Sequence, residues 1–293
     1  MDFQKLKTFQ TVATLMNFNR AAEVLHYAQS SVSAQIKTLE EEVGVLLFKR
    51  NGKQVSLTES GSKMLKYTNR ILALGEEALS DLNGGLMPEG LLTIRAPQTV
   101  ATCYLPGILK EFQPQHPKVK FDVNSCAFHT LENELRLGTV DIAFLLTESL
   151  QAAHLNVEML STEKLVVVAA PEHPLVNKSV VGYGDLLDCP VFLPKSDCGY
   201  RMPFDHALTV GKIEPALIME FNSVEAIKEC VKAGLGVTVI PEIAVQEEFK
   251  TGSLVPLSWE EDLEVALLMI WHQDQWLSPT LIDFMDTVRR VAG

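Results

Sequence analysis

The chain has 293 residues, of which 47% are hydrophobic, and its formal net charge is −12. This length is enough for two or three domains, and the hydrophobic content excludes a disordered chain. The acidic average argues against a nucleic-acid partner, because surfaces that follow a phosphate backbone are basic, but an average can conceal a difference between domains.

The charge is divided unevenly along the chain. Residues 1–65 hold eight Lys or Arg and six Asp or Glu, a balance of +2, which leaves −14 for the remainder. The first segment is therefore interpreted separately from the rest.

Three helices are predicted in the first forty residues: one over 3–16, one over 20–25 that Asn19 caps, and one over 29–39. The outward face of the third helix is expected to carry Gln29, Ser30, Ser31, Ser33, Gln35 and Lys37. Such side chains hydrogen-bond base edges or phosphates when a helix-turn-helix docks in the major groove. An ordinary solvated helix in a small bundle is the alternative.

A basic hairpin is predicted over residues 48–58, directly after these helices. Asn51-Gly52 has the chemistry of a tight turn, and Lys49, Arg50 and Lys53 flank it. Cations at a hairpin tip suit a wing that lies along a phosphate backbone. We therefore expect Arg50 and Lys53 to hold phosphates of double-stranded DNA.

The segment from Asn19 to Gly61 resembles the N-terminal winged helix of LysR-type transcriptional regulators. The matching positions are Ala21-Ala22, Gln29-Ser30, Ser33, Ile36, Leu39-Glu40, Gly44, Leu47-Phe48, Arg50, Leu57-Thr58 and Gly61. One departure is Ala34, where the family commonly has Arg or a polar residue, so Ala34 is not among the predicted DNA contacts. The resemblance implies a DNA-binding regulator that acts as a homodimer or homotetramer.

A long helix is predicted from Thr58, which can cap it, to about Leu86. A seven-residue repeat is formed by Leu65, Leu72, Leu79 and Leu86. Such a repeat indicates helix–helix dimerisation, the role that the resemblance also implies, whereas Thr68 and Gly75 weaken the seam. Packing on the helix's own domain is the alternative. Gly and Pro residues over 83–90 predict a domain boundary.

From Gly90 short apolar runs alternate with helical stretches, as βαβ units do. We predict strands at 91–94, 119–123, 140–145, 165–169, 191–193, 217–221, 237–240 and 266–270, and helices at 105–113, 131–137 and 279–291. This pattern predicts two α/β lobes joined by two crossovers. It resembles the LysR effector domain, which is similar to periplasmic binding proteins, at Leu105-Pro106, Asp141-Ile142-Ala143, His173-Pro174, Gly234-Leu235-Gly236-Val237 and Ile240-Pro241.

The predicted fold is thus α/β overall, in three parts. The winged helix-turn-helix takes residues 1–58, the linker helix 59–88 and the effector-binding domain 89–293. In the last part, lobe I takes 89–161 and 266–293, and lobe II takes 162–265.

Loops at the carboxyl ends of the strands predict an effector site between the lobes. Their hydroxyls and backbone N–H groups suit a small anion such as a carboxylate, although Thr99 and Ser223 would serve equally as helix caps. The resemblance implies that Thr99 contacts the effector. It also places Phe128 where Ser or Thr is frequent, which favours an apolar or aromatic effector. The predicted contacts are Thr99, Phe128, His129, Ser196, Cys198, Ser223 and Val224.

Catalytic and redox functions have weaker support. No G-x-S-x-G, Walker, H-E-x-x-H or G-x-G-x-x-G pattern is present, and the seven histidines are scattered, so we expect no enzyme, no metal and no cofactor. Cys198 resembles the peroxide-sensing cysteine of one family branch, and Arg201 nearby could lower its pKa. Because Ala207 lies near the expected place of a resolving cysteine and the next cysteine is Cys230, disulfide switching is not expected.

Two further function classes are alternatives. A solute-binding or transport-associated protein would explain the two lobes but neither the wing nor the heptad helix. An enzyme on the same lobes would need a catalytic constellation that the sequence lacks. No apolar run reaches the roughly 18 residues that span a bilayer, and the N-terminus has no signal-peptide core, so we expect a cytoplasmic protein.

Overall fold

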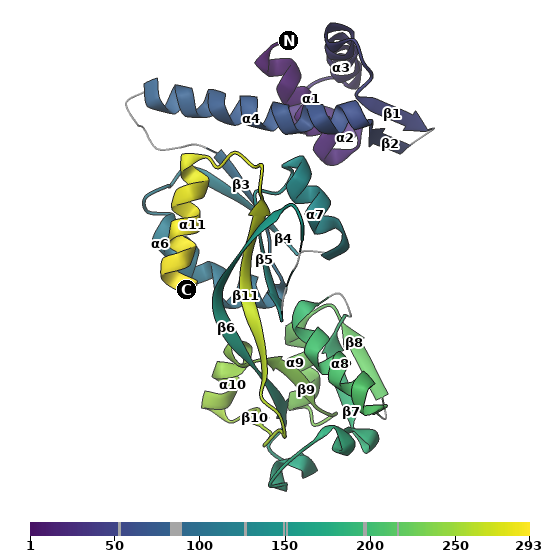
Figure 1. Cartoon of the computed structure of the whole chain (residues 1–293), viewed down its shortest axis with the longest axis vertical. Helices are drawn as coiled ribbons and strands as arrows, with labels where there is room; N and C mark the ends of the chain where they lie inside the picture. The colour runs from purple at the N-terminus through teal and green to yellow at the C-terminus, as the bar shows by residue number, and fades with distance from the viewer. Residues whose placement is uncertain are drawn as a thin grey trace.

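The computed structural model describes residues 1–51, 54–82, 90–125, 128–148, 150, 152–195, 198–215 and 217–293. In these residues an N-terminal helical part and two α/β lobes follow one another along the longest axis of the molecule (Figure 1). None of the described helices combines the length and the apolar character needed to cross a membrane.

The N-terminal part consists of three helices, a hairpin and one long helix. Their bounds are α1 Phe3–Leu15, α2 Phe18–Leu25, α3 Gln29–Val43, β1 Phe48–Asn51, β2 Gln54–Leu57 and α4 Glu59–Leu82. The strands β1 and β2 pair antiparallel with Asn51 opposite Gln54, so the predicted hairpin is confirmed. Phe9 of α1, Ile36 of α3 and Leu65 of α4 share one buried core, which makes this part a packed unit.

Hydrogen bonds of the caps explain where these helices begin. Asn17, and not the predicted Asn19, caps α2: its Oδ1 accepts from the backbone N–H groups of Asn19 and Arg20 at 2.9 and 3.1 Å. The prediction was two residues late because both positions are asparagine and only the earlier one has extended backbone. Thr58 caps α4 as predicted, since its Oγ1 accepts from Gly61 N–H at 2.8 Å.

The predicted dimer seam on α4 needs correction. Leu65 and Leu72 are buried inside the chain, with 0% and 7% of their surface exposed, so packing on the helix's own domain is the correct interpretation for both. Leu79 is exposed, and Leu86 lies outside the described residues. A second run of apolar residues, here called the exposed stripe of α4, consists of Tyr67, Leu74 and Ala78, which are exposed, and Ile71, which is half-buried. Their spacing of four, three and four is also a heptad pattern.

The effector-binding part is built on one seven-stranded sheet and one two-stranded sheet. The large sheet has the order β10-β6-β11-β5-β3-β4, with β9 paired to β6, and the small sheet pairs β7 with β8. The strands are β3 Gly90–Arg95, β4 Val119–Asn124, β5 Ile142–Thr147, β6 Leu155–Ala169, β7 Pro190–Pro194, β8 Leu217–Phe221, β9 Thr238–Pro241, β10 Val255–Pro256 and β11 Leu263–His272.

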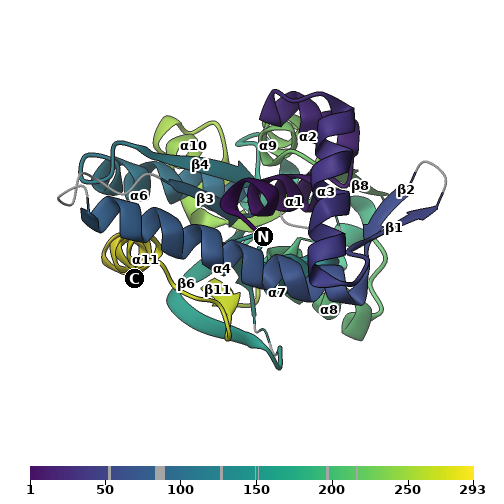
Figure 2. The ribbon, with the colours of Figure 1, turned by 90° about the horizontal axis from the view of Figure 1, so that it is seen from above.

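Helices cover these sheets in both lobes (Figure 1). The α-helices are α5 Gln98–Cys103, α6 Leu105–Phe112, α7 Phe128–Leu137, α8 Met202–Gly211, α9 Val224–Lys232, α10 Gln246–Thr251 and α11 Pro279–Ala292. Short 3-10 helices are η1 Pro174–Asn177, η2 Tyr183–Asp188, η3 Gly199–Arg201 and η4 Glu242–Val245. Seen from above, α4 lies across lobe I, and the β1–β2 hairpin projects at the end opposite α11 (Figure 2).

Two long antiparallel strands, β6 and β11, run through both lobes and form the predicted pair of crossovers. The strand β6 begins at Leu155, ten residues before the predicted strand at 165–169. Its first ten residues are only half-buried or exposed, so their polar character does not indicate a buried strand. The register of the pair shifts between Leu267 and Leu268, beside the predicted lobe boundaries.

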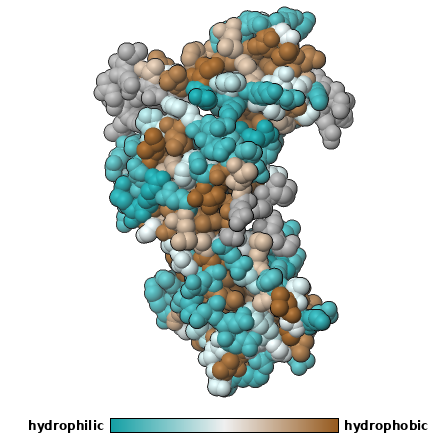
Figure 3. All heavy atoms as spheres, in the orientation of Figure 1, coloured by the Kyte–Doolittle hydropathy of each residue, from teal (hydrophilic) through white to brown (hydrophobic). Residues whose placement is uncertain are grey.

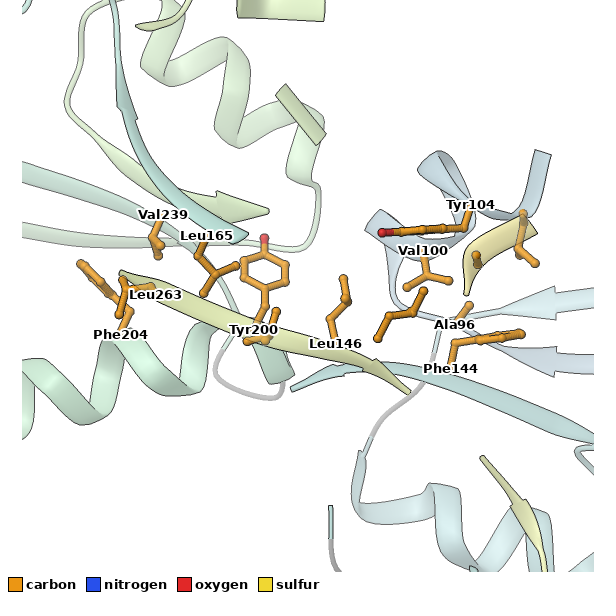
Figure 4. Close-up of a cluster of buried hydrophobic side chains, with 14 of the residues drawn as sticks. Ala96, Val100, Tyr104, Phe144, Leu146, Leu165, Tyr200, Phe204, Val239 and Leu263 are labelled. Carbon is orange, nitrogen blue, oxygen red and sulfur yellow. The ribbon is translucent and has the colours of Figure 1, made fainter. Parts of the chain in front are cut away.

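An apolar core continues from one lobe into the other. Figure 4 shows Phe204 and Val239 of lobe II, then Tyr200 and Leu146, then Phe144 of lobe I along one line of buried side chains. Each of these side chains has at most 1% of its surface exposed. The two lobes therefore pack on a shared core in addition to their shared strands.

Candidate DNA-binding and effector sites

The helix α3 presents most of the predicted polar side chains to solvent. Gln29, Ser30, Ser31 and Lys37 are exposed, whereas Ser33 is half-buried. Gln29 Nε2 donates to Ser33 Oγ at 2.9 Å, so these two side chains share one hydrogen bond on the helix surface. The N-terminal half of α3 thus offers a polar, mostly uncharged surface.

Gln35 departs from the prediction. It is half-buried, and its Oε1 accepts a hydrogen bond at 2.7 Å from the hydroxyl of Thr8, which is buried on α1. The expected outward orientation is wrong, because this hydroxyl needs an acceptor inside the bundle. Gln35 consequently fixes α3 against α1.

The hairpin carries the predicted wing. Lys49 is exposed, and the backbone of Arg50 pairs with Val55. Lys53 and the side chain of Arg50 lie outside the described residues. Phe48 buries its ring against Phe9 and Phe18, with centroids 5.4 and 5.6 Å apart, and so anchors the base of the wing to the helical bundle.

A hydrogen bond joins the two lobes at the predicted effector site. Gln98 Oε1, at the start of α5 in lobe I, accepts from Val224 N–H at 2.9 Å, at the start of α9 in lobe II. Ser223 caps α9, since its Oγ accepts from Ala226 N–H at 3.3 Å. The capping interpretation therefore holds for Ser223, and the predicted backbone donor at Val224 already has an acceptor.

Thr99 behaves differently from Ser223. It lies inside α5, whose N-cap position is Pro97, and only 2% of its surface is exposed. Its Oγ1 is buried without a hydrogen-bond partner among the described residues. Leaving a buried hydroxyl unpaired costs about 1–3 kcal/mol. Thr99 thus has a hydrogen-bonding group without a partner among the described residues, beside the lobe junction.

The remaining predicted contacts are only partly described. Phe128 and His129 belong to the first turn of α7 and not to the preceding loop, and their side chains lie outside the described residues, as does Ser196. Cys198 is half-buried directly before η3. Arg201, expected to act on its thiol, binds Asp205 at 2.7 Å and also pairs with Glu220. Two carboxylates therefore neutralise the cation.

The part of the chain that the structure describes holds no group of three or more His, Cys, Asp or Glu side chains arranged to bind a metal ion. Tyr104, which lies between α5 and α6, donates from its hydroxyl to Glu163 on the crossover strand β6. Burial and the neighbouring carboxylate raise the pKa of Tyr104 well above its ordinary value, so the phenol stays protonated and acts as a donor.

Comparison with known proteins gives the family. The family model described as a bacterial regulatory helix-turn-helix protein of the lysR family matches residues 3–62, and the LysR substrate binding domain matches residues 87–293. The chain belongs to the LysR family of transcriptional regulators. The expected winged helix-turn-helix and two-lobed α/β fold are thereby confirmed.

Relatives of this LysR-family regulator match over nearly their whole length. The uncharacterized HTH-type transcriptional regulator YwqM of Bacillus subtilis is 38% identical and is covered, like this chain, over 99%. The HTH-type transcriptional regulator CzcR of the same organism is 32% identical, over 98% of this chain and 97% of its own. Among solved structures, ArgP from Mycobacterium tuberculosis has a TM-score of 0.76 at 24% identity and covers 100% and 98% of the two chains.

Gln98 is the residue of this regulator that the sequence interpretation missed. It lies between Pro97 and Thr99, but a lone glutamine has no pattern that distinguishes it from a solvated residue. Its partner Val224 is 126 positions away. Only the approach of the two lobes reveals the contact.

Proposed function

We propose that this LysR-family regulator reads DNA through α3 and the wing while an effector at the lobe junction sets its activity. The observation that carries the first half is the exposed polar surface of α3, formed by Gln29, Ser30, Ser31 and Lys37, beside a basic hairpin on the same helical bundle. Exposed hydroxyl and amide groups read base edges, and Arg50 and Lys53 then hold phosphates. Gln35 acts by positioning α3.

Two copies of the chain are needed for this reading, because a single winged helix offers few contacts. The exposed stripe of α4 supports a homodimer or homotetramer: Tyr67 and Leu74 each expose 58% of their surface on a 24-residue helix. An apolar heptad stripe left open by the fold suits a second copy of the same helix. The acidic remainder of the chain helps to keep the effector lobes away from the phosphates.

The effector half of the proposal rests on Thr99, Gln98 and Val224. The N–H of Val224 at the start of α9 suits an anionic group, and a carboxylate would compete with Gln98 Oε1 for it. The unpaired Thr99 hydroxyl adds a polar contact. An effector that replaces Gln98 as the acceptor of the Val224 N–H would remove a hydrogen bond between the lobes. The effector would then bind one relative arrangement of the two lobes more tightly than another.

Footprinting with the full chain on the DNA upstream of its own gene tests the DNA-binding half. We expect Lys53→Ala to weaken binding about equally on the protected site and on random duplex, and to reduce the slope of log K against log salt by about 0.9. Ser30→Ala is expected to reduce discrimination between the two DNAs by about 1–3 kcal/mol. Lys110→Ala, an exposed lysine on α6, is the matched control.

Absence of protection at every protein concentration would contradict the proposal. Equal losses on both DNAs for Ser30→Ala would remove base reading from that position, and an unchanged salt slope for Lys53→Ala would remove the phosphate contact.

A further inference from the structure

A cavity of about 90 Å³ lies in the joint between α4 and lobe I, on the opposite side of lobe I from lobe II. Its walls come from α4, from the end of α7 and from the segment between β11 and the first turn of α11. Hydrophilic atoms run across α4 and onto the top of lobe I on the face shown in Figure 3. The cavity therefore lies between the DNA-binding part and the effector part of the chain.

Asn69 holds this joint together. Its Nδ2 donates to the carbonyl oxygens of Leu137 and Gly138 at 3.0 and 2.7 Å, and its Oδ1 accepts from Gln10 of α1 at 2.9 Å. Lys66 of α4 adds an ion pair to Asp274 at 2.9 Å. One side of the cavity is thus a set of contacts that links α1, α4 and lobe I.

The cavity is also lined by polar groups that lack a hydrogen-bond or ion-pair partner among the described residues. Gln275 donates from Nε2 to Asp141 O at 2.9 Å, but its Oε1 is buried without a partner among the described residues. The carboxylate of Asp141 accepts from Thr93 N–H at 2.7 Å and has no cation in ion-pair contact in the described chain.

Two guanidinium groups lie at the rim of the same cavity. Arg70 of α4 and Arg136 of α7 are both exposed and line it. Arg136 donates to Asn133 Oδ1 at 2.6 Å, and neither arginine forms an ion pair with a carboxylate among the described residues. A guanidinium matches a carboxylate in shape and in charge. The joint therefore offers cations at its rim and acceptors deeper inside.

This combination selects the chemistry of a ligand. We propose that the cavity binds a small zwitterionic amino acid, with its carboxylate against Arg70 and Arg136 and its ammonium donating to Gln275 Oε1 and the Asp141 carboxylate. The buried side chains of Leu135 and Leu281 line the apolar part of the wall. A cavity of about 90 Å³ holds more than one water, so it has room for a ligand of a few non-hydrogen atoms such as alanine.

Such a ligand would bridge α4 and lobe I at the joint that Asn69 already fixes. Its binding would favour the arrangement of the two parts in which both arginines reach the carboxylate. This site is separate from the effector site at the lobe junction, and its existence does not depend on that site.

Isothermal titration calorimetry of the full chain with L-alanine tests the proposal. We expect saturable binding, with propionate (no ammonium) and ethylamine (no carboxylate) at least about tenfold weaker. Arg70→Gln and Arg136→Gln should each weaken alanine binding about tenfold. Arg290→Gln, an exposed arginine of α11 that pairs with Glu111 outside the cavity, should leave it unchanged.

Three results would overturn the proposal. The first is no binding of alanine, glycine or serine to the wild-type chain. The second is propionate binding as tightly as alanine. The third is alanine binding that Thr99→Val abolishes and Arg136→Gln does not, which would place the ligand at the lobe junction.

Discussion

Among single residues, buried polar groups have the properties that depend most on the fold. Asp141 illustrates this, because burial raises the pKa of its carboxyl from the ordinary 3.8 to about 6. The folded chain holds this proton more tightly than the unfolded chain does. The group therefore stabilises the fold at low pH, and this stabilisation is lost as the pH rises from about 3.8 through about 6.

Asp141→Asn tests this pKa shift. The amide cannot ionise, so we expect the free energy of unfolding of the variant to rise relative to wild type by up to about 3 kcal/mol between about pH 4 and about pH 8. Urea denaturation across this pH range measures the difference. Asp122→Asn removes an exposed carboxyl of β4 and serves as the control. Parallel pH curves for wild type and Asp141→Asn would contradict the shift.

Helix caps and long-range hydrogen bonds differ in how far the sequence determines them. Thr58 could be assigned as a cap from its position, because capping depends on neighbours three residues away. The choice between Asn17 and Asn19 needed the backbone conformation. The partners of Thr8 and Gln98 lie 27 and 126 positions away, so no local pattern could predict either contact.

At the scale of elements, α4 shows how tertiary contacts select among apolar faces. The sequence correctly predicts a long helix that Thr58 caps, and its heptad leucines suggest a dimer seam. Two of those leucines are used by the chain's own core, and the exposed stripe of α4 lies on another face. Helical periodicity identifies apolar faces but not the neighbour that each one covers.

Gly61 explains why α4 can start where it does. A Cβ atom at this position would lie 2.0 Å from the backbone oxygen of Leu47. Because a backbone oxygen cannot rotate away as a side chain does, we expect Gly61→Ala to destabilise the chain by about 3 kcal/mol, measured as a fall in Tm.

The matched control is Gly107→Ala in α6. There the nearest atom is Val291 Cγ1 at an ordinary contact distance of 3.5 Å. This variant should gain up to about 1 kcal/mol from helix propensity. Equal stabilities of the two variants would show that the approach of Gly61 to Leu47 is unimportant.

At the scale of the whole molecule, the lobes are joined by other contacts in addition to the two crossover strands. The strands β6 and β11 run through both, the apolar core is continuous, and Gln98 bonds to Val224 across the junction. A ligand at this junction acts on contacts that both lobes share. Its binding energy can therefore change their relative arrangement.

A thermal-shift panel of small carboxylates and aromatic acids tests the junction as the effector site. A binding compound should raise Tm by several degrees in wild type, since it stabilises the folded chain by mass action. We expect Thr99→Val to lose most of this shift and to keep the wild-type DNA affinity.

Thr102→Val is the matched control for that variant. Thr102 lies on the same helix, but it is exposed and its hydroxyl donates to Gln98 O at 2.8 Å. An unchanged shift in Thr99→Val would exclude Thr99 from the site.

The family, the order of the parts and most elements follow from the sequence alone, because caps, periodicity and turn chemistry act over a few residues. The sequence also locates the basic segment within an acidic chain. Only the packing of the whole chain shows which leucines of α4 are buried, that Gln35 faces α1, and that β6 is one strand through both lobes. It also brought Gln98 to Val224 and assembled the cavity beside Asn69. These features depend on residues far apart in the chain, whose proximity is fixed only when the helices and the sheet pack together.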